Sequence, residues 1–329
     1  MNILTPSRRS LLAAAGLAPF ARPAAAQSWM PTRTVSIVVP FAPGGTTDVM
    51  ARLIAQPMQR HFGQSVVVEN VTGAGGNIGG GRVARAEPDG HTMLLAHIGV
   101  LSVNQHLYRE MPFQTMRDFA PVGLLCTNPM LLMVSARAGI ENLEALKARA
   151  RSGRLRIATS GNGSTMHLAA LQFLKSVGGR ADLIPYRGGG QAIGDLLAGT
   201  VDMFLEQALG GTPHVRSGGV KAFAVTGPER ITALPDVPTA AEAGLHGLDI
   251  QIWNAVMLPR ATPQAVVAAH NAALSVALDD ATVQNRFTTF AARIPQGEER
   301  APGALAQVIT RDSEQWGELL RAAGVGKDS

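Results

Sequence analysis

Short runs of β-branched and apolar residues alternate with helix-like patterns along most of this chain, and this alternation limits the possible folds. The runs cover residues 34–39, 65–70, 91–96, 154–159, 182–186, 201–206 and 221–226. Apolar residues at helical spacing lie between them, for example over residues 48–63 and 168–179. Strands and helices in alternation predict an α/β fold with a mainly parallel sheet flanked by helices.

The length of the chain indicates two domains, because 329 residues exceed what one sheet usually organises. Two apolar stretches, residues 124–135 and 248–259, resemble strands that cross between domains. If both stretches cross between the domains, domain 1 consists of residues 27–128 and 255–329, and domain 2 consists of residues 129–254. Two helical patterns near the C-terminus, over residues 263–287 and 303–324, then pack back on domain 1.

Residues 1–26 are interpreted as an export signal peptide. Arg8 and Arg9 precede an apolar stretch, and three alanines precede Gln27, as at a cleavage site between Ala26 and Gln27. The pattern fits the twin-arginine and the general secretion route, and an ordinary N-terminal helix is the alternative. Cleavage predicts an exported protein. It also removes three arginines and no acid, which reduces the formal charge from +5 to +2. So small a charge argues against nucleic-acid binding. The single cysteine, Cys126, excludes a disulfide within the chain.

The stretch FAPGGTTDVMAR, residues 41–52, predicts a loop that leaves a strand and enters a helix around a ligand. Gly44 and Gly45 allow the backbone to approach a ligand closely. The N–H groups at the start of the next helix favour a carboxylate or phosphate, and Thr46 and Thr47 add hydroxyl groups. Asp48 falls in the first helical turn. The alternative is an ordinary turn in which Asp48 caps the helix.

Two further glycine-rich turns repeat this pattern in the second half of the chain, over residues 158–170 and 185–202. Three such turns predict a cleft at the carboxyl ends of two sheets, where helix starts hold an anion. Ser164 and His167 also permit a secreted serine hydrolase. The segment lacks the G-x-S-x-G elbow and an acid to orient the histidine, so that alternative is the weaker one.

No cofactor or metal site is predicted. The glycines of residues 70–85 fit a dinucleotide fingerprint poorly, and no Walker loop follows them. The eight histidines show no H-x-x-x-H spacing.

Six motifs, in their order along the chain, resemble those of the tripartite tricarboxylate transporter substrate-binding proteins, also called Bug proteins. They are PFAPGGTTDVMAR, VVVENVTGAGGNIGG, EPDGHTMLLA, ATSGNGSTMHLAA, PYRGGGQAIGDLLAGTVDMF and LPDVPTAAEAGL. The resemblance implies a two-domain periplasmic binding protein, of the type that closes on its ligand like a flytrap, without catalytic activity. It also implies the ligand-binding residues, which are Phe41, Gly44, Gly45, Thr46, Thr47, Asp48, Ser160, Gly163, Ser164, Thr165, Gly190, Gln191 and Ala192.

The resemblance further implies the partners. The ligand is a small carboxylate (a di- or tricarboxylate, an aromatic acid or an amino acid), and the protein, as a monomer, passes it to membrane transporter subunits. A ligand-sensing module for a membrane receptor is the other alternative. Two departures from the family leave the ligand open: Leu171 replaces a frequent acidic residue, and Leu205-Glu206 replaces the usual Phe-Asp pair.

Overall fold

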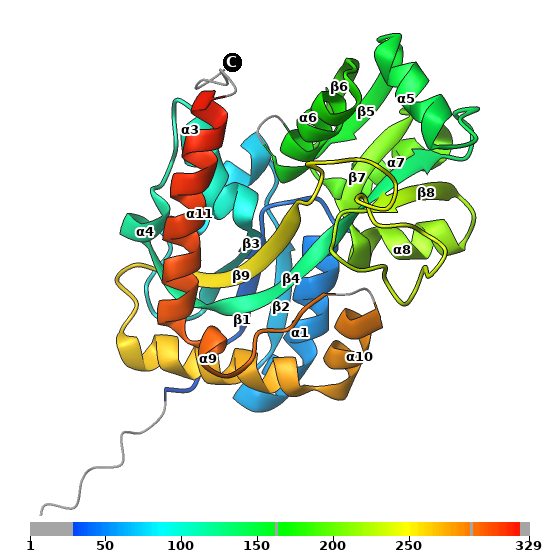
Figure 1. The fold of residues 1–329 in the computed structure, drawn as a ribbon. Helices are drawn as coiled ribbons and strands as arrows, with labels where there is room; N and C mark the ends of the chain where they lie inside the picture. The colour runs from blue at the N-terminus through cyan, green and yellow to red at the C-terminus, as the bar shows by residue number, and fades with distance from the viewer. Residues whose placement is uncertain (1–28, 162–163, 290–291, 323–329) are drawn as a thin grey trace, which may run out of the picture.

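The computed structural model describes residues 29–161, 164–289 and 292–322 (Figure 1). The predicted signal peptide and Gly163 lie outside these residues. The described strands are β1 (Val35–Val39), β2 (Val66–Asn70), β3 (Thr92–His97), β4 (Phe119–Ser135), β5 (Leu155–Thr159), β6 (Ala181–Pro185), β7 (Met203–Gln207), β8 (Val220–Val225) and β9 (Gln251–Pro259). All seven strands expected from the apolar runs are present. Strand β4 contains the first predicted crossover stretch, and β9 contains all of the second except residues 248–250.

Helices lie between these strands and after them. They are α1 (Thr46–Phe62), α2 (Asn77–Ala84), α3 (Asn104–Leu107), α4 (Thr115–Asp118), α5 (Leu143–Arg151), α6 (Thr165–Val177), α7 (Gly189–Ala198), α8 (Ala208–Arg216), α9 (Gln264–Asp279), α10 (Ala281–Thr289) and α11 (Pro302–Ala322). Among the described residues, no helix has the length and apolar character needed to cross a membrane.

The strands hydrogen-bond in the order β2-β1-β3-β9-β4-β7-β5-β6, and β8 also pairs with β4. The pairs of β1 with β2 and β3, and of β5 with β6 and β7, are parallel, as expected. The expectation of a mainly parallel sheet needs correction in the middle. There β9 is antiparallel to β3 and β4, and β4 is antiparallel to β7 and β8. The reason is topological. Strand β4 leads from the half of the molecule that contains β1 to β3 into the half that contains β5 to β8, and β9 leads back, so the two strands run in opposite directions.

Strand β4 belongs to both halves of the molecule (Figure 1). Its residues 119–129 pair with β9, and its residues 130–135 pair with β7 and β8. The partner changes between Pro129 and Met130, one residue after the boundary that the sequence predicts. The boundaries themselves, 128/129 and 254/255, stay a prediction.

The core is continuous through both halves. The side chains of β1, β3 and β4 are almost entirely buried, and Cys126 on β4 is fully inaccessible. Helix α9 packs on α1, and α11 packs on β4, so the C-terminal helices return to the half that contains β1. Figure 1 shows α9 and α11 on that half, with β5, β6 and β8 on the other.

Candidate ligand-binding cavity

Four strands of the two halves end around one small cavity. Phe41 follows β1, His97 ends β3, Ser160 follows β5 and Gln207 ends β7. The cavity is lined by Phe41, Gly45, Thr46, Thr47, His97, Ser160, Met166, Gly189, Glu206 and Gln207. This is the place where α/β sheets bind ligands, because the strand ends and the helix starts meet there. Its free space has room for about one water molecule.

The cavity is tight because loops from the two halves touch backbone to backbone. A methyl group on Gly190 would lie 2.0 Å from the carbonyl oxygen of Pro43, and one on Gly188 would lie 2.5 Å from the nitrogen of Ala42. Only glycines permit this approach between the loop before α1 and the start of α7. A ligand larger than water therefore enters only when these two loops move apart.

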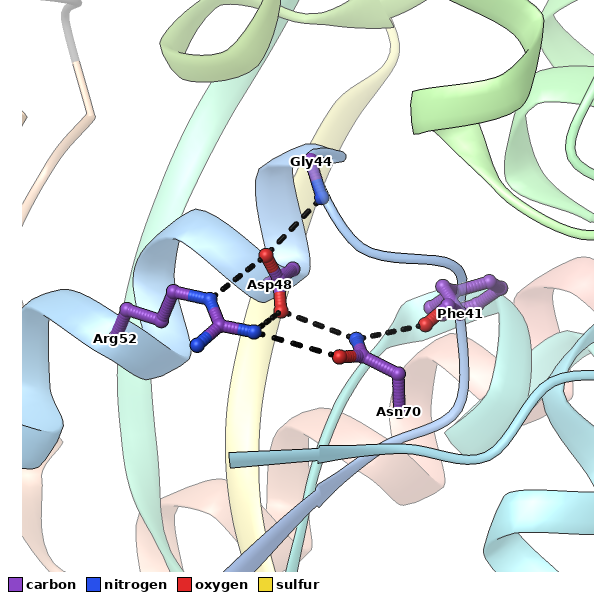
Figure 2. Close-up of polar contacts among 5 residues, drawn as sticks. All are labelled: Phe41, Gly44, Asp48, Arg52 and Asn70. Carbon is purple, nitrogen blue, oxygen red and sulfur yellow. Dashed lines mark hydrogen bonds and ion pairs between the residues drawn. The ribbon is translucent and has the colours of Figure 1, made fainter. Parts of the chain in front are cut away.

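Asp48 organises the loop that precedes α1 (Figure 2). Its carboxylate accepts hydrogen bonds from the N–H of Gly44, from Arg52 and from Asn70 Nδ2, each with a donor–acceptor distance of 3.0 Å. Asn70 Nδ2 also donates to the carbonyl oxygen of Phe41 at 2.9 Å. Burial alone would raise the pKa of Asp48, but these hydrogen bonds outweigh it and hold the pKa below its ordinary value. Because both carboxylate oxygens are occupied, the structure gives Asp48 a positioning role.

His97 forms an uncharged wall of the cavity. Its ring stacks on Phe41 with 4.7 Å between ring centroids and 9° between ring planes. Its Nδ1 atom accepts a hydrogen bond from the N–H of Gly99 at 3.0 Å and lies 3.3 Å from the hydroxyl of Thr165. Burial lowers the pKa of His97 to about 4, so the ring is neutral at physiological pH.

Glu206 brings a carboxyl group into the cavity, and 1% of the residue is exposed. Its Oε1 atom accepts hydrogen bonds from Thr46 Oγ1 at 2.9 Å and from the N–H of Gln207 at 2.8 Å. Its Oε2 atom has no hydrogen-bond partner among the residues that the structure describes. Burial raises the pKa of Glu206 to about 7. Thr46 and Glu206 come from different halves of the molecule, so their hydrogen bond links the halves.

A buried amide cluster lies behind Glu206. The Nδ2 atom of Asn254 on β9 donates to Gln207 Oε1 at 2.8 Å and to Asn128 Oδ1 at 3.2 Å. These bonds leave Gln207 Nε2 without a partner among the described residues. Gln207 also lines the cavity, so this side chain joins the crossover strands to the candidate site.

The structure brings five of the predicted ligand residues together at the cavity wall: Phe41, Gly45, Thr46, Thr47 and Ser160. The others that the structure describes lie outside the lining and have other contacts. Gly44 donates to Asp48, Thr165 contacts His97, and Gly190 faces Pro43. Gln191 is exposed and accepts a hydrogen bond from the N–H of Arg187, and Ala192 is buried outside the cavity lining.

Ser164 caps helix α6. Its hydroxyl oxygen accepts a hydrogen bond from the backbone N–H of His167 at 3.2 Å. This is the usual function of a serine at a helix N-cap. The contact of any of the thirteen residues with a ligand stays a prediction.

Sequence reasoning missed five residues of the lining: His97, Met166, Gly189, Glu206 and Gln207. The rule that located the loops, that ligands bind at strand ends, also points to His97 and Gln207, which end β3 and β7. Glu206 carried a signal as well, since the pair Leu205-Glu206 departs from the family pattern. Met166 had no signal of its own, because a methionine inside a helix is usually a core residue.

Comparison with known proteins identifies the family. Residues 50–325 match the model of the tripartite tricarboxylate transporter family receptor. MatC from Rhodopseudomonas palustris, solved with bound malate, is 37% identical, has a TM-score of 0.84, and the match covers 88% of this chain and 100% of MatC. The periplasmic binding protein BugD is also 37% identical at a TM-score of 0.84, with 90% and 99% coverage.

A third solved relative, R. palustris Rpa4515 with adipate, is 31% identical with a TM-score of 0.84 over 90% of this chain and 99% of that protein. The family match covers far more than half of the chain, and the structural matches extend over nearly all of the described fold. The chain therefore belongs to the tripartite tricarboxylate transporter receptor family, the Bug family, and has the two-domain fold of its periplasmic binding proteins.

Proposed function

We propose that this protein is an exported, non-enzymatic solute-binding protein that closes on a small carboxylate and delivers it to a membrane transporter of the tripartite tricarboxylate type. The observation that carries the proposal is the cavity at four strand ends, enclosed by loops from both halves. Relatives with the same fold have been solved with malate and with adipate, both of which are small dicarboxylates. A ligand between the two halves would stabilise the closed arrangement over an open one.

The residues present suit a carboxylate. The N-cap residues of α1 and α7 are Gly45 and Gly188, so neither helix start has a side-chain cap. The N–H groups of their first turns and their positive dipole ends therefore face the cavity from two sides. Thr47 adds a hydroxyl donor to the lining, and Ser160 adds a hydroxyl that donates to Met166 Sδ at 3.1 Å. This arrangement binds an anion without a lysine or arginine in the wall.

Thermal denaturation with a panel of mono-, di- and tricarboxylates, aromatic acids and amino acids tests the proposal. A ligand at 100 times its dissociation constant stabilises the folded state by about 2.7 kcal/mol, which raises the melting temperature by several degrees. A sugar and a polyamine serve as controls. A shift with a control compound and with none of the carboxylates would refute carboxylate binding.

The hydrolase alternative predicts a different outcome. The hydroxyl oxygen of Ser164 accepts the capping hydrogen bond of α6, which favours a structural role for this residue. A hydrolase would turn over generic esters steadily and lose that turnover in a Ser164→Ala variant. A binding protein would show saturable binding without turnover, and the same variant would lose at most the stability that the cap contributes.

Export is tested separately. Mass analysis of protein from the periplasm should give a mature N-terminus near Gln27. Full-length protein that retains Met1 in the cytoplasm would contradict it.

A further inference from the structure

The Oε2 atom of Glu206 is a buried hydrogen-bond acceptor that no described residue uses. Its position is well defined, because Thr46 and the N–H of Gln207 hold the other oxygen, Oε1. Gly189 lies directly beside Oε2: a methyl group on Gly189 would lie 2.2 Å from this atom. A buried acceptor without a partner costs free energy, so a bound ligand that supplies a donor gains from this site.

The charges around the cavity give a second reason why a ligand should supply a hydrogen-bond donor to Glu206. The described residues that line it include no lysine or arginine, and His97 is neutral. The nearby Arg52 forms an ion pair with Asp48 at 3.0 Å. A carboxylate ligand therefore meets the carboxylate of Glu206 without a cation between them, and like charges at close range repel each other strongly in a buried site.

Thr46 indicates where a ligand has to carry the donor group that offsets the repulsion between its carboxylate and Glu206. This residue is the first of α1, so its backbone N–H lies among the donors proposed for the ligand carboxylate, and its hydroxyl donates to Glu206. The ligand carboxylate and Glu206 thus share one residue as a neighbour. With the carboxylate at these N–H groups, a donor group on the carbon next to it would lie close enough to reach Oε2.

We propose that Glu206 makes this cavity selective for carboxylates that carry a hydrogen-bond donor, an ammonium or a hydroxyl group, on the carbon next to the carboxylate. The inference rests on the proposed function and narrows its substrate class. Gln207 supports it, because its unpartnered Nε2 atom in the same wall is a donor for the ligand carboxylate. An acceptor and a donor on two lining residues of the same cavity match a 2-amino or 2-hydroxy acid.

Two series of matched acids test this inference by calorimetry at pH 8, where Glu206 is ionised. Succinate, malate and aspartate share a four-carbon skeleton and differ only in the hydrogen, hydroxyl or ammonium on carbon 2. Adipate and 2-aminoadipate give the same comparison for six carbons. In at least one series the acid with the donor should bind roughly 10-fold or more tightly than the acid without it, as expected for a hydrogen bond to a charged group.

The variant Glu206→Gln should remove this preference. Its amide oxygen keeps the hydrogen bonds from Thr46 and Gln207, which places the NH₂ group, a donor, where the wild type has an acceptor. The substituted acids should lose their advantage, and succinate or adipate should bind at least as well as before. Gly189→Ala is a second test that keeps the carboxyl group: its methyl group displaces Oε2 and should reduce the preference too. Glu144→Gln, at an exposed residue of α5, is the control for the loss of one charge.

Equal affinities within both series, or a preference that is the same in Glu206→Gln as in the wild type, would overturn the inference and leave carboxylate binding intact. Binding of neither series would also overturn it. The broader panel described for the proposed function then decides separately whether the protein binds carboxylates at all.

Discussion

At the scale of single residues, the burial of Glu206 reduces the stability of the folded state by an amount that depends on pH. Burial raises the pKa of this carboxyl group from 4.5 to about 7, so the folded state holds the proton more tightly than the unfolded state. The stability that this proton contributes is fully present below pH 4.5 and is lost as the pH rises through 7. Shifts of this size correspond to roughly 3 kcal/mol between the two limits.

Glu206→Gln should therefore be more stable than the wild type at pH 8 and about equal to it at pH 5. The expected gain at pH 8 is roughly 2–3 kcal/mol, because the amide carries no charge to bury. Urea denaturation of both proteins across this range measures the difference. A difference that is the same at pH 5 and pH 8 would show that the wild-type carboxyl group does not titrate near 7.

The comparison with the variant is necessary because buried histidines act in the opposite direction. Burial lowers the pKa of His97 and of His270 to about 4, from an ordinary value of 6.5. Their contribution to stability is present above pH 6.5 and is lost as the pH falls toward 4. Both histidines are present in the wild type and in Glu206→Gln, so their effect cancels in the difference between the two.

Asp48 gives a second prediction at the residue scale. Asp48→Asn keeps the shape of the side chain but removes the charge and one of the two acceptor oxygens. The variant should lose about 1–3 kcal/mol of stability, because Gly44, Arg52 and Asn70 can no longer all donate to it. Carboxylate binding should weaken as well, since the loop before α1 is held less firmly. Denaturation and calorimetry measure the two effects.

Asp279→Asn is the matched control. Asp279 forms an ion pair with Arg300 at 2.8 Å, and 60% of its side chain is exposed. Exposed pairs contribute about 0–1 kcal/mol, so this variant should bind as the wild type does. An Asp48→Asn protein with unchanged stability and affinity would mean that the hydrogen bonds in Figure 2 do not hold the loop.

At the scale of helices and strands, the sequence predicted positions better than roles. The seven β-branched runs and the glycine-rich turns after them are local signals, so β1, β5 and the loop before α1 could be located from the chain alone. Roles depend on partners far apart in sequence. Asp48 was expected among the ligand residues, but its partner Asn70 comes 22 positions later, and Glu206 faces Thr46 across 160 positions. No local pattern contains such pairs.

The contact between the α1 loop and α7 leads to a prediction with an internal control. Gly190→Ala places a methyl group 2.0 Å from the carbonyl oxygen of Pro43 and should prevent the two loops from meeting. Gly194→Ala lies in the same helix with no atom within 4 Å of the new methyl group. Alanine is favoured over glycine inside a helix by about 1 kcal/mol, so Gly194→Ala should be slightly more stable and bind normally.

Calorimetry and small-angle X-ray scattering distinguish the two variants. Gly190→Ala should bind the ligand at least 10-fold more weakly, because interactions made only in the closed arrangement are lost. Its radius of gyration should also stay unchanged when the ligand is added. If Gly190→Ala binds and contracts like Gly194→Ala, the contact between these loops is not required for closure.

At the scale of the whole molecule, the positions of β4 and β9 in the chain could be predicted from the sequence, but their directions in the sheet could not. Their apolar stretches indicated two crossovers, and the structure places β4 in both halves of the sheet. The direction of the strands could not be predicted, because an apolar run has the same sequence pattern in a parallel pair and in an antiparallel pair. Pairs such as Asn254 with Gln207 then tie the crossover strands to the site across long stretches of chain.

This topology predicts that the two halves unfold together. Strand β4 runs without a break from its pairing with β9 to its pairing with β7, so neither half can unfold without disrupting the other half's sheet. The tryptophans allow a direct test, because the chain has only Trp29, Trp253 and Trp316. Trp253 Nε1 donates to Asp312 Oδ2 on α11 at 2.6 Å, and Trp29 packs on Phe62 and His270. Their fluorescence therefore reports on the half that contains α1, α9 and α11.

Far-UV circular dichroism reports on the helices of both halves, including α5 to α8. We expect the urea transitions followed by fluorescence and by circular dichroism to coincide, and a saturating ligand to move both midpoints by the same amount. A circular dichroism transition that precedes the fluorescence transition would mean that residues 129–254 unfold on their own. In that case β4 and β9 would act as linkers between independent domains, and a ligand bound between the two should bring the two midpoints closer together.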